Sequence, residues 1–502
     1  MASSSSRGPL KNRQLNARTQ LQLGGALPGN PVRYLGVAKG QTRAGAFTPP
    51  VSGRNQVVRP SDDDYGEFQT IGSTKTAPDQ GTVSVTQDIK WDQVTALEEI
   101  YSDDLIVSLH ILLGKGAVGN PNGWDSKIVI PDAELTSMPL SGDFQGADSD
   151  EVLMWNGEFG FSTKFQRAVR LTWNNLVAAT VTTPITGVAF GAYRRIQYAI
   201  GRGDGAAAVP IFYYSTNGGV AWTALSLTGL LAATAEDPLD LAYTGGYLIA
   251  PTAVTTGSYI WAPEDTATTL AAWTEVATGF VNTHSPNKVY AASLSRIFFA
   301  AEDGYVYLLE NIGSGVTVIQ DGSITSEDQN DVDGFGDCVV TCGDNNTILA
   351  SQNNGASFAL VTGPIGSTVL NCIAVLSEDC WVVGAANGIA YYTKDRGTTW
   401  HAMGFGGSGA GAVTDIFFDK GIQAYGLLAH RTAGSVAKVY RTTDAGNTWE
   451  QFTLTGYPTS NTCSRLAAWD CNTLLAGGIA TTTTDGILAL AKNESLADAI
   501  VN

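Results

Sequence analysis

The chain has 502 residues, of which 44% are hydrophobic and 15% are charged, and its formal net charge is −18. This composition excludes a disordered chain, and the 57 glycines favour many short strands joined by tight turns. No apolar run reaches the roughly 18 residues of a membrane-spanning helix, and the length allows at least two domains. We therefore expect a mainly β protein with several domains and no insertion into a membrane.

The first 60 residues carry seven arginines, two lysines and no acidic residue, whereas the remainder has 20 basic and 47 acidic side chains. This segment lacks the apolar stretch of a secretory signal and is too polar to bury a core of its own. We interpret residues 1–65 as an extended basic arm that lies on an acidic surface. The acidic body of a neighbouring copy supplies such a surface, and direct binding of DNA is the less favoured alternative.

Residues 66–175 combine several strand patterns with one short helix and predict a β-rich, sandwich-like assembly domain. Thr82–Trp91 alternates apolar and polar residues like a half-buried strand, and Leu105–Leu113 is a strongly apolar strand candidate. Val94–Tyr101 has a short helical pattern. The dipeptide Asn156-Gly157 predicts a tight turn between two long strands.

Residues 176–502 are repetitive and end in a predicted short C-terminal helix. Two eight-residue turns, Thr393–Trp400 (TKDRGTTW) and Thr442–Trp449 (TTDAGNTW), are closely similar, and weaker copies begin at Ser215 and Ser351. The four starts are separated by 136, 42 and 49 residues, which fits a repeat of about 45 residues with two copies that lack the turn. Repeats of this length, built from four short strands, are typical of β-propeller blades. The repetitive region has room for about seven of them.

The eight-residue turn resembles the Asp-box of the BNR repeat family, whose pattern is Ser/Thr-x-Asp-x-Gly-x-Thr-Trp. This motif recurs in sialidases, in sortilin-type receptors and in photosystem assembly factors related to Ycf48. The resemblance implies a structural hairpin at the outer edge of a blade, away from a central pocket. The matching positions are Ser215, Asn217, Gly219, Trp222, Ser351, Asn353, Gly355, Phe358, Thr393, Asp395, Gly397, Trp400, Thr442, Asp444, Gly446 and Trp449.

The residue types of the turn have a direct physical explanation. A short Asp or Asn side chain accepts hydrogen bonds from nearby backbone N–H groups and organises the turn. The glycine permits a positive φ, and the final aromatic ring packs between strands. We therefore assign the Asp and Asn side chains a structural role rather than a catalytic one.

Sialidases share this repeat, so glycoside hydrolysis is a remote alternative. Such an enzyme needs an arginine triad, a Tyr nucleophile with a Glu partner, and an acid. The Arg-Ile-Pro signature of that family is missing, because the nearest string, Arg194-Arg195-Ile196, continues to Gln197. The four histidines show no ligand spacing, and no phosphate loop or nucleophile elbow is present. We predict no catalytic residue, no cofactor and no enzymatic activity.

An acidic stretch, DQNDVDGFGD, holds Asp328, Asp331, Asp333 and Asp337. With its first glycine at the sixth position of an EF-hand loop, the first and last ligand positions hold Gln and Val instead of acidic residues. We predict a solvated acidic loop without a dedicated metal site, and weak binding of a cation stays open.

The six cysteines provide two candidate disulfides. Cys372 and Cys380 are eight residues apart, and so are Cys463 and Cys471, at the same place in their repeats. A repeated pair that straddles a hairpin favours disulfides across two strands. Buried free thiols in a reducing compartment are the alternative.

Together, the arm, the assembly domain and the repeats predict a structural subunit of a bacteriophage virion. Residues 66–175 loosely resemble a tail-tube domain, so we expect a tail-tube, other tail or capsid component that self-assembles in many copies. Its expected partners are copies of itself and other virion proteins, while the propeller faces outward, where it could bind a ligand on the host surface. The alternative is a Ycf48-like photosystem assembly factor in a thylakoid or periplasmic lumen, or another propeller binding module.

Overall fold

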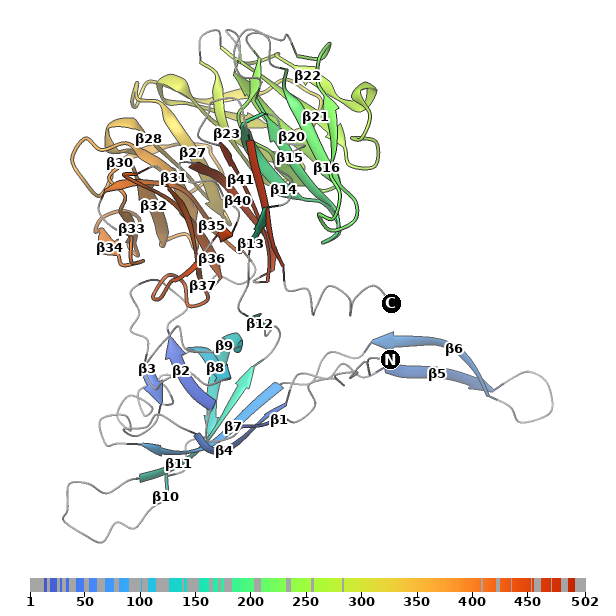
Figure 1. Ribbon diagram of the computed structural model, residues 1–502, viewed down its shortest axis with the longest axis vertical. Helices are drawn as coiled ribbons and strands as arrows, with labels where there is room; N and C mark the ends of the chain where they lie inside the picture. Colours follow the sequence, from blue (N-terminus) through green and yellow to red (C-terminus); the bar gives the residue numbers. More distant parts are fainter. Residues whose placement is uncertain are drawn as a thin grey trace. The chain divides into compact units, whose positions relative to one another are not determined.

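The computed structural model describes residues 183–492 apart from short gaps and, before residue 183, mainly a series of strands (Figure 1). The gaps lie at 203–208, 232–235, 254–256, 282–283, 408–409, 421–424, 435, 453, 456–461, 471 and 480–485. The chain divides into a first unit, Met1–Ala26 with Asn30–Val169, and a second unit, Leu27–Gly29 with Arg170–Asn502. The second unit thus begins a few residues before the predicted boundary at 176. Of the predicted helix Val94–Tyr101, only Tyr101 is described, and it is helical; the predicted C-terminal helix lies outside the described residues.

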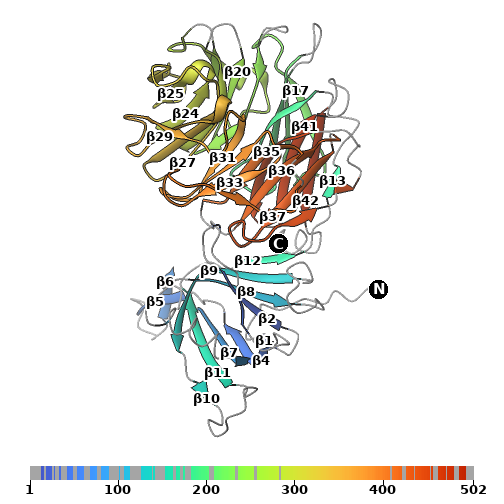
Figure 2. The ribbon, with the colours of Figure 1, turned by 90° about the vertical axis from the view of Figure 1, so that its left-hand side faces the viewer.

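The first unit contains a ten-stranded sheet with the order β1-β4-β7-β11-β9-β8-β2-β3, to which β10 and β12 add at the side (Figure 2). Its strands are β1 (Arg13–Leu15), β2 (Thr19–Gly24), β3 (Arg33–Leu35), β4 (Thr42–Thr48), β7 (Gly81–Ile89), β8 (Val107–Leu113), β9 (Ser126–Ser137), β10 (Leu140–Ser141), β11 (Leu153–Phe161) and β12 (Gln166–Val169). Strands β7 and β8 confirm the two strands predicted from alternation and apolar content.

The turn predicted at Asn156-Gly157 is wrong. Both residues lie inside β11, where Asn156 pairs with Thr86 and Gly157 pairs with Val85 of β7. The dipeptide is a strong local turn signal, but a complete antiparallel ladder on both of its sides overrides that preference.

Four strands of the sheet come from the segment that we predicted to be an extended arm. Strand β4 of that segment pairs with β7, and β2 pairs with β8, both antiparallel. Strand β5 (Arg54–Pro60) pairs with β6 (Phe68–Lys75) in a separate two-stranded sheet. These strands satisfy their backbone hydrogen bonds within the first unit. This finding corrects the expectation that the arm needs a neighbouring copy to become ordered.

The described residues of the second unit form seven sheets of four or five strands, which we call blades 1 to 7. In five of them, consecutive strands pair antiparallel from the first strand to the last. Blade 1 consists of β14 (Ile185–Phe190), β15 (Gln197–Gly201), β16 (Ile211–Ser215) and β17 (Thr223–Ser226). Blade 2 consists of β18 (Asp237–Pro238), β19 (Ala242–Thr244), β20 (Tyr247–Ala253), β21 (Ser258–Pro263) and β22 (Thr274–Val276). Blade 3 consists of β23 (Pro286–Ser293), β24 (Arg296–Ala301), β25 (Tyr305–Leu309) and β26 (Thr317–Asp321).

The remaining strands complete blades 4 to 7. Blade 4 consists of β27 (Gln329–Phe335), β28 (Cys338–Gly343), β29 (Thr347–Ser351) and β30 (Ala359–Thr362), and blade 5 of β31 (Leu370–Val375), β32 (Trp381–Ala385), β33 (Ala390–Thr393) and β34 (His401–Met403). Blade 6 consists of β35 (Gly411–Phe418), β36 (Gly426–Thr432), β37 (Ala437–Thr442) and β38 (Glu450–Phe452). Blade 7 consists of β40 (Thr462–Asp470), β41 (Thr473–Ile479), β42 (Gly486–Lys492), β13 (Trp173–Asn175) and β39 (Leu454–Thr455). Three short 3-10 turns, Leu270–Ala272, Glu302–Gly304 and Asp344–Asn346, interrupt this all-β pattern.

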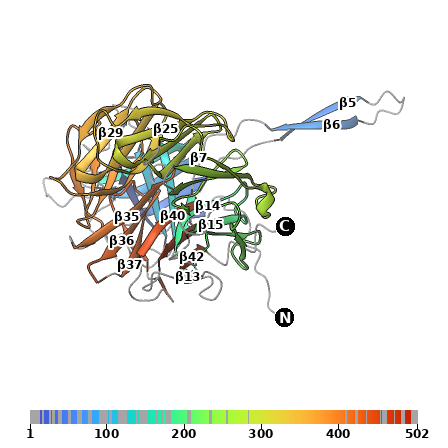
Figure 3. The same ribbon diagram turned by 90° about the horizontal axis from the view of Figure 1, so that it is seen from above.

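Blade 7 joins the two ends of the second unit. Its last strand, β42, pairs antiparallel with β13, which precedes blade 1 in the chain (Figures 2 and 3). The first strand of blade 7, β40, packs against β14 of blade 1. The ring of blades is therefore closed by backbone hydrogen bonds between residues that are far apart in the sequence.

The first strands of the blades line the middle of the ring, and the last strands lie at its outside. Packing contacts connect β23 with β27, β27 with β31, β31 with β35, and β35 with β40. Second strands such as β32 are buried along their whole length, because both faces of each sheet are covered by the neighbouring blades. This arrangement places side chains of several first strands around one central space.

Candidate functional site

The four predicted turn motifs each connect the third and fourth strands of a blade, at the outside of the ring. In every turn the Ser or Thr hydroxyl donates to the Asp or Asn Oδ1 over 2.7–2.9 Å and accepts from the glycine N–H over 2.8–2.9 Å. The Oδ1 also accepts from the backbone N–H four residues on, over 2.8–3.0 Å. The glycines have φ values of 80° to 85°. These hydrogen bonds hold each turn together and leave no side chain of the motif directed at the central space.

The aromatic residue that ends each motif is buried or half-buried, in agreement with the packing role predicted for it. Trp222 and Trp449 are buried, whereas Trp400 and Phe358 are half-buried. The indole N–H of Trp449 donates to the carbonyl of Gly446 over 3.0 Å, inside its own turn. These rings stabilise the outer edges of their blades.

The predicted Cys372–Cys380 disulfide is wrong. Both residues are buried free thiols. Cys372 pairs with Gly384 near the start of the hairpin, whereas Cys380 lies at its turn beside Val375 and Trp381. Along a strand this separation is about four residues at about 3.3 Å each, well beyond the Cα spacing of a disulfide. Cys463 is also free and buried, and Cys471 lies outside the described residues.

The acidic stretch predicted to be a solvated loop is largely a strand instead. Gln329–Phe335 forms β27, the first strand of blade 4, so Asp331 and Asp333 face the middle of the ring. No group of three or more His, Cys, Asp or Glu in the described part of the chain is placed to hold a metal ion. The prediction missed the strand because four acidic residues in ten resemble a turn rather than the interior of a sheet.

A β-bulge recurs at one position of the first strands. The pairing with the second strand skips one residue there, namely Thr186, Asn287, Asn330, Asn371, Thr414 and Ser464. The first five of these side chains donate to a backbone carbonyl of the next blade, over 2.5–3.1 Å. Five of these six bulges therefore direct a polar side chain across the junction between two blades.

The residue after the bulge is directed at the central space in blades 4, 6 and 7, where it is Asp331, Asp415 and Arg465. Asp331 accepts a hydrogen bond from the N–H of Ile373 over 2.9 Å, and Asp415 accepts one from Leu466 over 2.7 Å. In blade 2, Asp240 makes the corresponding bond with the next blade through the N–H of Val289, over 3.3 Å. In blade 7 the same position holds Arg465. Three carboxylates and one guanidinium thus converge from four different blades.

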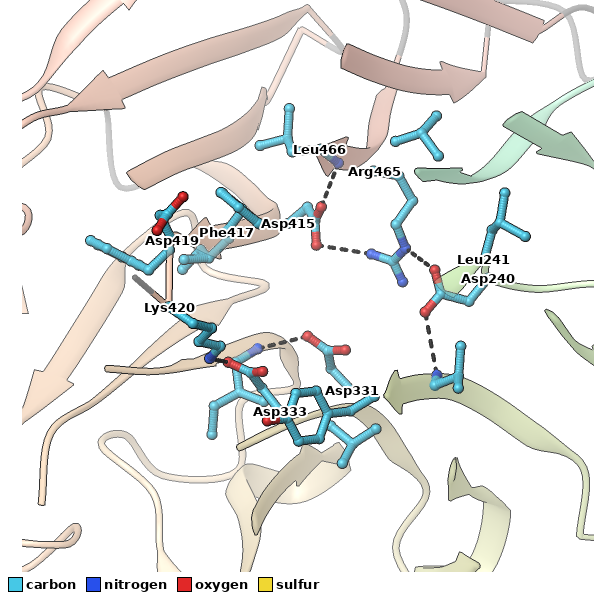
Figure 4. Close-up of a pocket in the computed structure, with 17 residues that line it drawn as sticks. Asp240, Leu241, Asp331, Asp333, Asp415, Phe417, Asp419, Lys420, Arg465 and Leu466 are labelled. Carbon is cyan, nitrogen blue, oxygen red and sulfur yellow. Dashed lines mark hydrogen bonds and ion pairs between the residues drawn. The ribbon is translucent and has the colours of Figure 1, made fainter. Parts of the chain in front are cut away.

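Arg465 binds two of these carboxylates in a cavity of about 370 Å³ (Figure 4). Its Nε donates to Asp240 and its Nη1 donates to Asp415, each over 2.9 Å. The Arg465 side chain is only 9% exposed. Its Nη2 is buried and has no hydrogen-bond partner. In Figure 4 the guanidinium lies between the two carboxylates, and Asp331 faces the same opening from below.

A second ion pair lies at the rim of this cavity. Lys420 follows β35 and its ammonium group bonds to the Asp333 carboxylate and, over 2.7 Å, to the carbonyl of Val375. Asp333 also accepts from the N–H of Val375 over 2.7 Å. Lys420 therefore compensates the charge of Asp333, as Arg465 does for Asp240 and Asp415.

The three inner carboxylates have raised pKa values. Lost hydration raises the pKa of Asp331 well above its ordinary value, and the neighbouring Asp415 charge raises it further. Burial likewise raises the pKa of Asp415 well above its ordinary value, against the hydrogen bond from Leu466. For Asp240, burial raises the pKa although the charge of Arg465 opposes the shift. Burial, together with repulsion between neighbouring carboxylates, therefore disfavours the charged forms of these side chains.

An apolar groove of about 500 Å³ adjoins the cavity. The two share the walls formed by Val188, Leu241, Phe417 and Leu466. Beyond that wall the groove is lined by small and aromatic residues of blades 1, 2 and 7, which include Phe190, Tyr243 and Trp469. Trp469 is 40% exposed and lies 6.3 Å from Phe190, measured between ring centroids. We call the cavity and the groove together the channel site.

The comparisons with known proteins identify the fold of the second unit. Ycf48 from Cyanidioschyzon merolae matches with a TM-score of 0.50 and 13% identity, over 64% of this chain and 99% of that chain. YCF48 bound to D1 peptide matches with a TM-score of 0.50 and 12% identity, over 64% of this chain and 95% of that chain.

The fold is a β-propeller. At these identities the likeness shows the fold alone. No family model matches the chain, and no curated protein matches it. The propeller predicted from the repeats is therefore confirmed, and these comparisons lend no support to the bacteriophage tail domain.

The residues of the channel site were not singled out by the sequence analysis, apart from Asp331 and Asp333. An alignment of the repeats could have identified them, because Asp240, Asp331, Asp415 and Arg465 come from corresponding parts of four propeller blades and line one cavity. The Arg194-Arg195 pair, which we considered for a sialidase, does not line the cavity or the groove. Across the described residues, none of the helices is long and apolar enough to cross a membrane.

Proposed function

We propose that the propeller is a non-enzymatic binding module that holds a segment of a partner protein in the channel site. The observation that carries this proposal is the shared wall between a charged cavity and an apolar groove with an exposed tryptophan. Exposed aromatic residues beside polar pockets are the usual anchors of protein interfaces. An extended segment can place one side chain in the cavity and its neighbours in the groove.

Two further features support binding rather than catalysis. The carboxylates of the cavity accept hydrogen bonds from backbone N–H groups of adjacent blades, which fixes them as parts of the wall. In addition, one similar propeller structure is that of YCF48 bound to D1 peptide. A propeller of this fold thus accommodates a peptide, and we extend that mode of binding, without its particular ligand, to this chain. The alternative of a self-assembling virion subunit has no comparable support.

The proposal is tested by selecting random peptides on the immobilised full-length protein and measuring their affinity in solution. We expect Trp469→Ala to weaken the selected peptides by about tenfold or more, because a central aromatic anchor contributes about 2 kcal/mol or more. The matched control is Leu360→Ala, which removes a 54% exposed apolar side chain from the outer strand β30. Selected peptides that bind Trp469→Ala and the wild type equally well would disprove the channel site as the binding surface.

A further inference from the structure

Resting on this proposed function, we infer that the cavity of the channel site takes a basic side chain, a guanidinium or an ammonium group, of the bound segment. The inference names the chemistry of the ligand, which the binding of a protein segment alone leaves open. It follows from the charge of the cavity, from one carboxylate without a cation, and from one buried donor without an acceptor.

Acidic side chains outnumber basic ones on the cavity wall. Five carboxylates line it, those of Asp240, Asp331, Asp333, Asp415 and Asp419, whereas its cations are Arg465 and Lys420. Arg465 is occupied by two of the carboxylates and Lys420 by a third. A ligand that enters this space as an anion would meet repulsion, and one that enters as a cation would be attracted.

Asp331 is the carboxylate that such a cation would reach. Its side chain is half-buried, and the one hydrogen bond that the described residues give it comes from the N–H of Ile373. No ion pair joins it to a cation within the described part of the chain. A charged carboxylate in this position has lost hydration without gaining an opposite charge. A basic side chain of the partner would supply that charge.

The unpaired Nη2 of Arg465 is an independent feature of the same space. Its guanidinium is planar and is fixed by the bonds to Asp240 and Asp415, so the direction of Nη2 is fixed as well. A buried N–H donor without an acceptor costs free energy that a ligand oxygen can recover. The backbone carbonyl of a bound segment is such an acceptor. A bare metal ion could neutralise Asp331, but it would offer Nη2 no acceptor.

The groove determines what flanks the basic residue. Because its walls are continuous with those of the cavity, the neighbours of a basic side chain in the cavity would contact Phe190 and Trp469. Both are large apolar rings, and Trp469 is available to stack or to pack. The preferred segment therefore has a Lys or Arg beside apolar residues.

The test uses two matched libraries of capped hexapeptides with random apolar flanks, which differ only in arginine or citrulline at the third position. Citrulline has nearly the shape of arginine without its charge. We expect the full-length protein to retain the arginine library at least about tenfold more strongly, since removal of one partner from a buried charge pair is costly. Asp331→Asn should remove this preference, because the Asn oxygen still accepts from Ile373 but carries no charge.

Two further variants complete the test. Asp331→Glu restores the charge and should restore the preference for arginine, whether or not Asp331→Asn lowers the stability of the fold. Asp265→Asn makes the same change of charge at an exposed position after β21 and should leave the preference intact.

Equal retention of both libraries, with loss of both in Trp469→Ala, would overturn the inference but leave the proposed function standing. Retention of neither library would overturn the inference. The proposed function is then judged separately, by whether the selection of random peptides yields binders that depend on Trp469. A preference for arginine that survives in Asp331→Asn would show that the cavity is not the cation site.

Discussion

At the scale of single residues, Asp331 couples the channel site to the stability of the propeller. Its pKa is raised well above the ordinary 3.8 by lost hydration first, and then by the charges of Asp415, Asp240 and Asp333. Because the folded protein holds this proton more tightly than the unfolded chain, the stabilisation is complete below about pH 3.8. It is lost as the pH rises through the raised folded pKa.

We therefore predict that Asp331→Asn is more stable than the wild type near neutral pH. The difference should be about 1–3 kcal/mol, the typical cost of a buried polar group without its partners. It should shrink toward pH 4, where Asp331 is protonated and as neutral as Asn. Calorimetric melting across a pH series measures both effects. A difference that is independent of pH, or that also occurs in Asp265→Asn, would contradict this account.

The turn motif provides a second prediction at this scale. Asp395 accepts hydrogen bonds from the hydroxyl and the N–H of Thr399 and from Thr393, and these lower its pKa to about 2. We expect Asp395→Ala to lower the Tm of the propeller by a few degrees and Asp395→Asn to change it little. In Asn353 the amide makes the equivalent contacts, since its Nδ2 donates to Ser357 over 2.9 Å.

The pH dependence of this turn has the opposite sign to that of Asp331. The pKa of Asp395 is lowered on folding, so its stabilisation is present above about pH 3.8 and is lost as the pH falls toward 2. The difference in Tm between wild type and Asp395→Ala should therefore narrow between pH 4 and 2. Equal effects of the Ala and Asn variants would show that the hydrogen bonds of the turn do not matter for stability.

At the scale of elements, the closure of the ring depends on β13. Its three residues pair with Ala489–Ala491 of β42, so that β13 lies between β42 and β39 in blade 7. A chain that begins at Arg170 should fold and melt cooperatively, whereas one that begins at residue 176 lacks β13 and leaves β42 with an open edge. We expect its Tm to be lower by several degrees in differential scanning calorimetry. Identical melting of the two chains would mean that β13 is dispensable.

The repeats predicted the blades well but could not predict this closure or the channel site. Every blade of one propeller buries the same faces, so apolar runs and turns recur at a fixed period and can be recognised. Strand β13 has no motif, and its partner lies more than 300 residues away. The bulges add one residue to the first strands and break the alternation of facing residues, so Asp331 and Asp415 could not be assigned to the inner face.

At the scale of the whole molecule, the basic segment and the acidic remainder remain the main asymmetry of the chain. From the sequence, we expected the basic segment to bind an acidic neighbour. The structure instead pairs β1 to β4 within the first unit, with β1 and β4 at one edge of the sheet and β2 and β3 at the other. Polar strands of this kind can be ordered without a core of their own when a strand such as β7 or β8 supplies the backbone partners.

This arrangement predicts the result of deleting residues 2–60. The deletion removes β1 to β5 and leaves β7-β11-β9-β8 as a sheet with two open edges. Open edges lose backbone hydrogen bonds and favour association with other chains. We expect the shortened protein to lose protection of its first unit in limited proteolysis, while the melting transition of the propeller changes little.

The same deletion distinguishes the two roles of the basic segment. If it served only to grip neighbouring copies, the first unit of the shortened protein would stay folded and resistant to protease. Full-length protein would then assemble at low salt and dissociate as salt screens the charges over about 8–10 Å. Sedimentation of both proteins across a salt series, combined with proteolysis, decides between these outcomes. We expect salt to have little effect on the fold of the full-length first unit, because backbone hydrogen bonds, not charges, hold its edge strands in place.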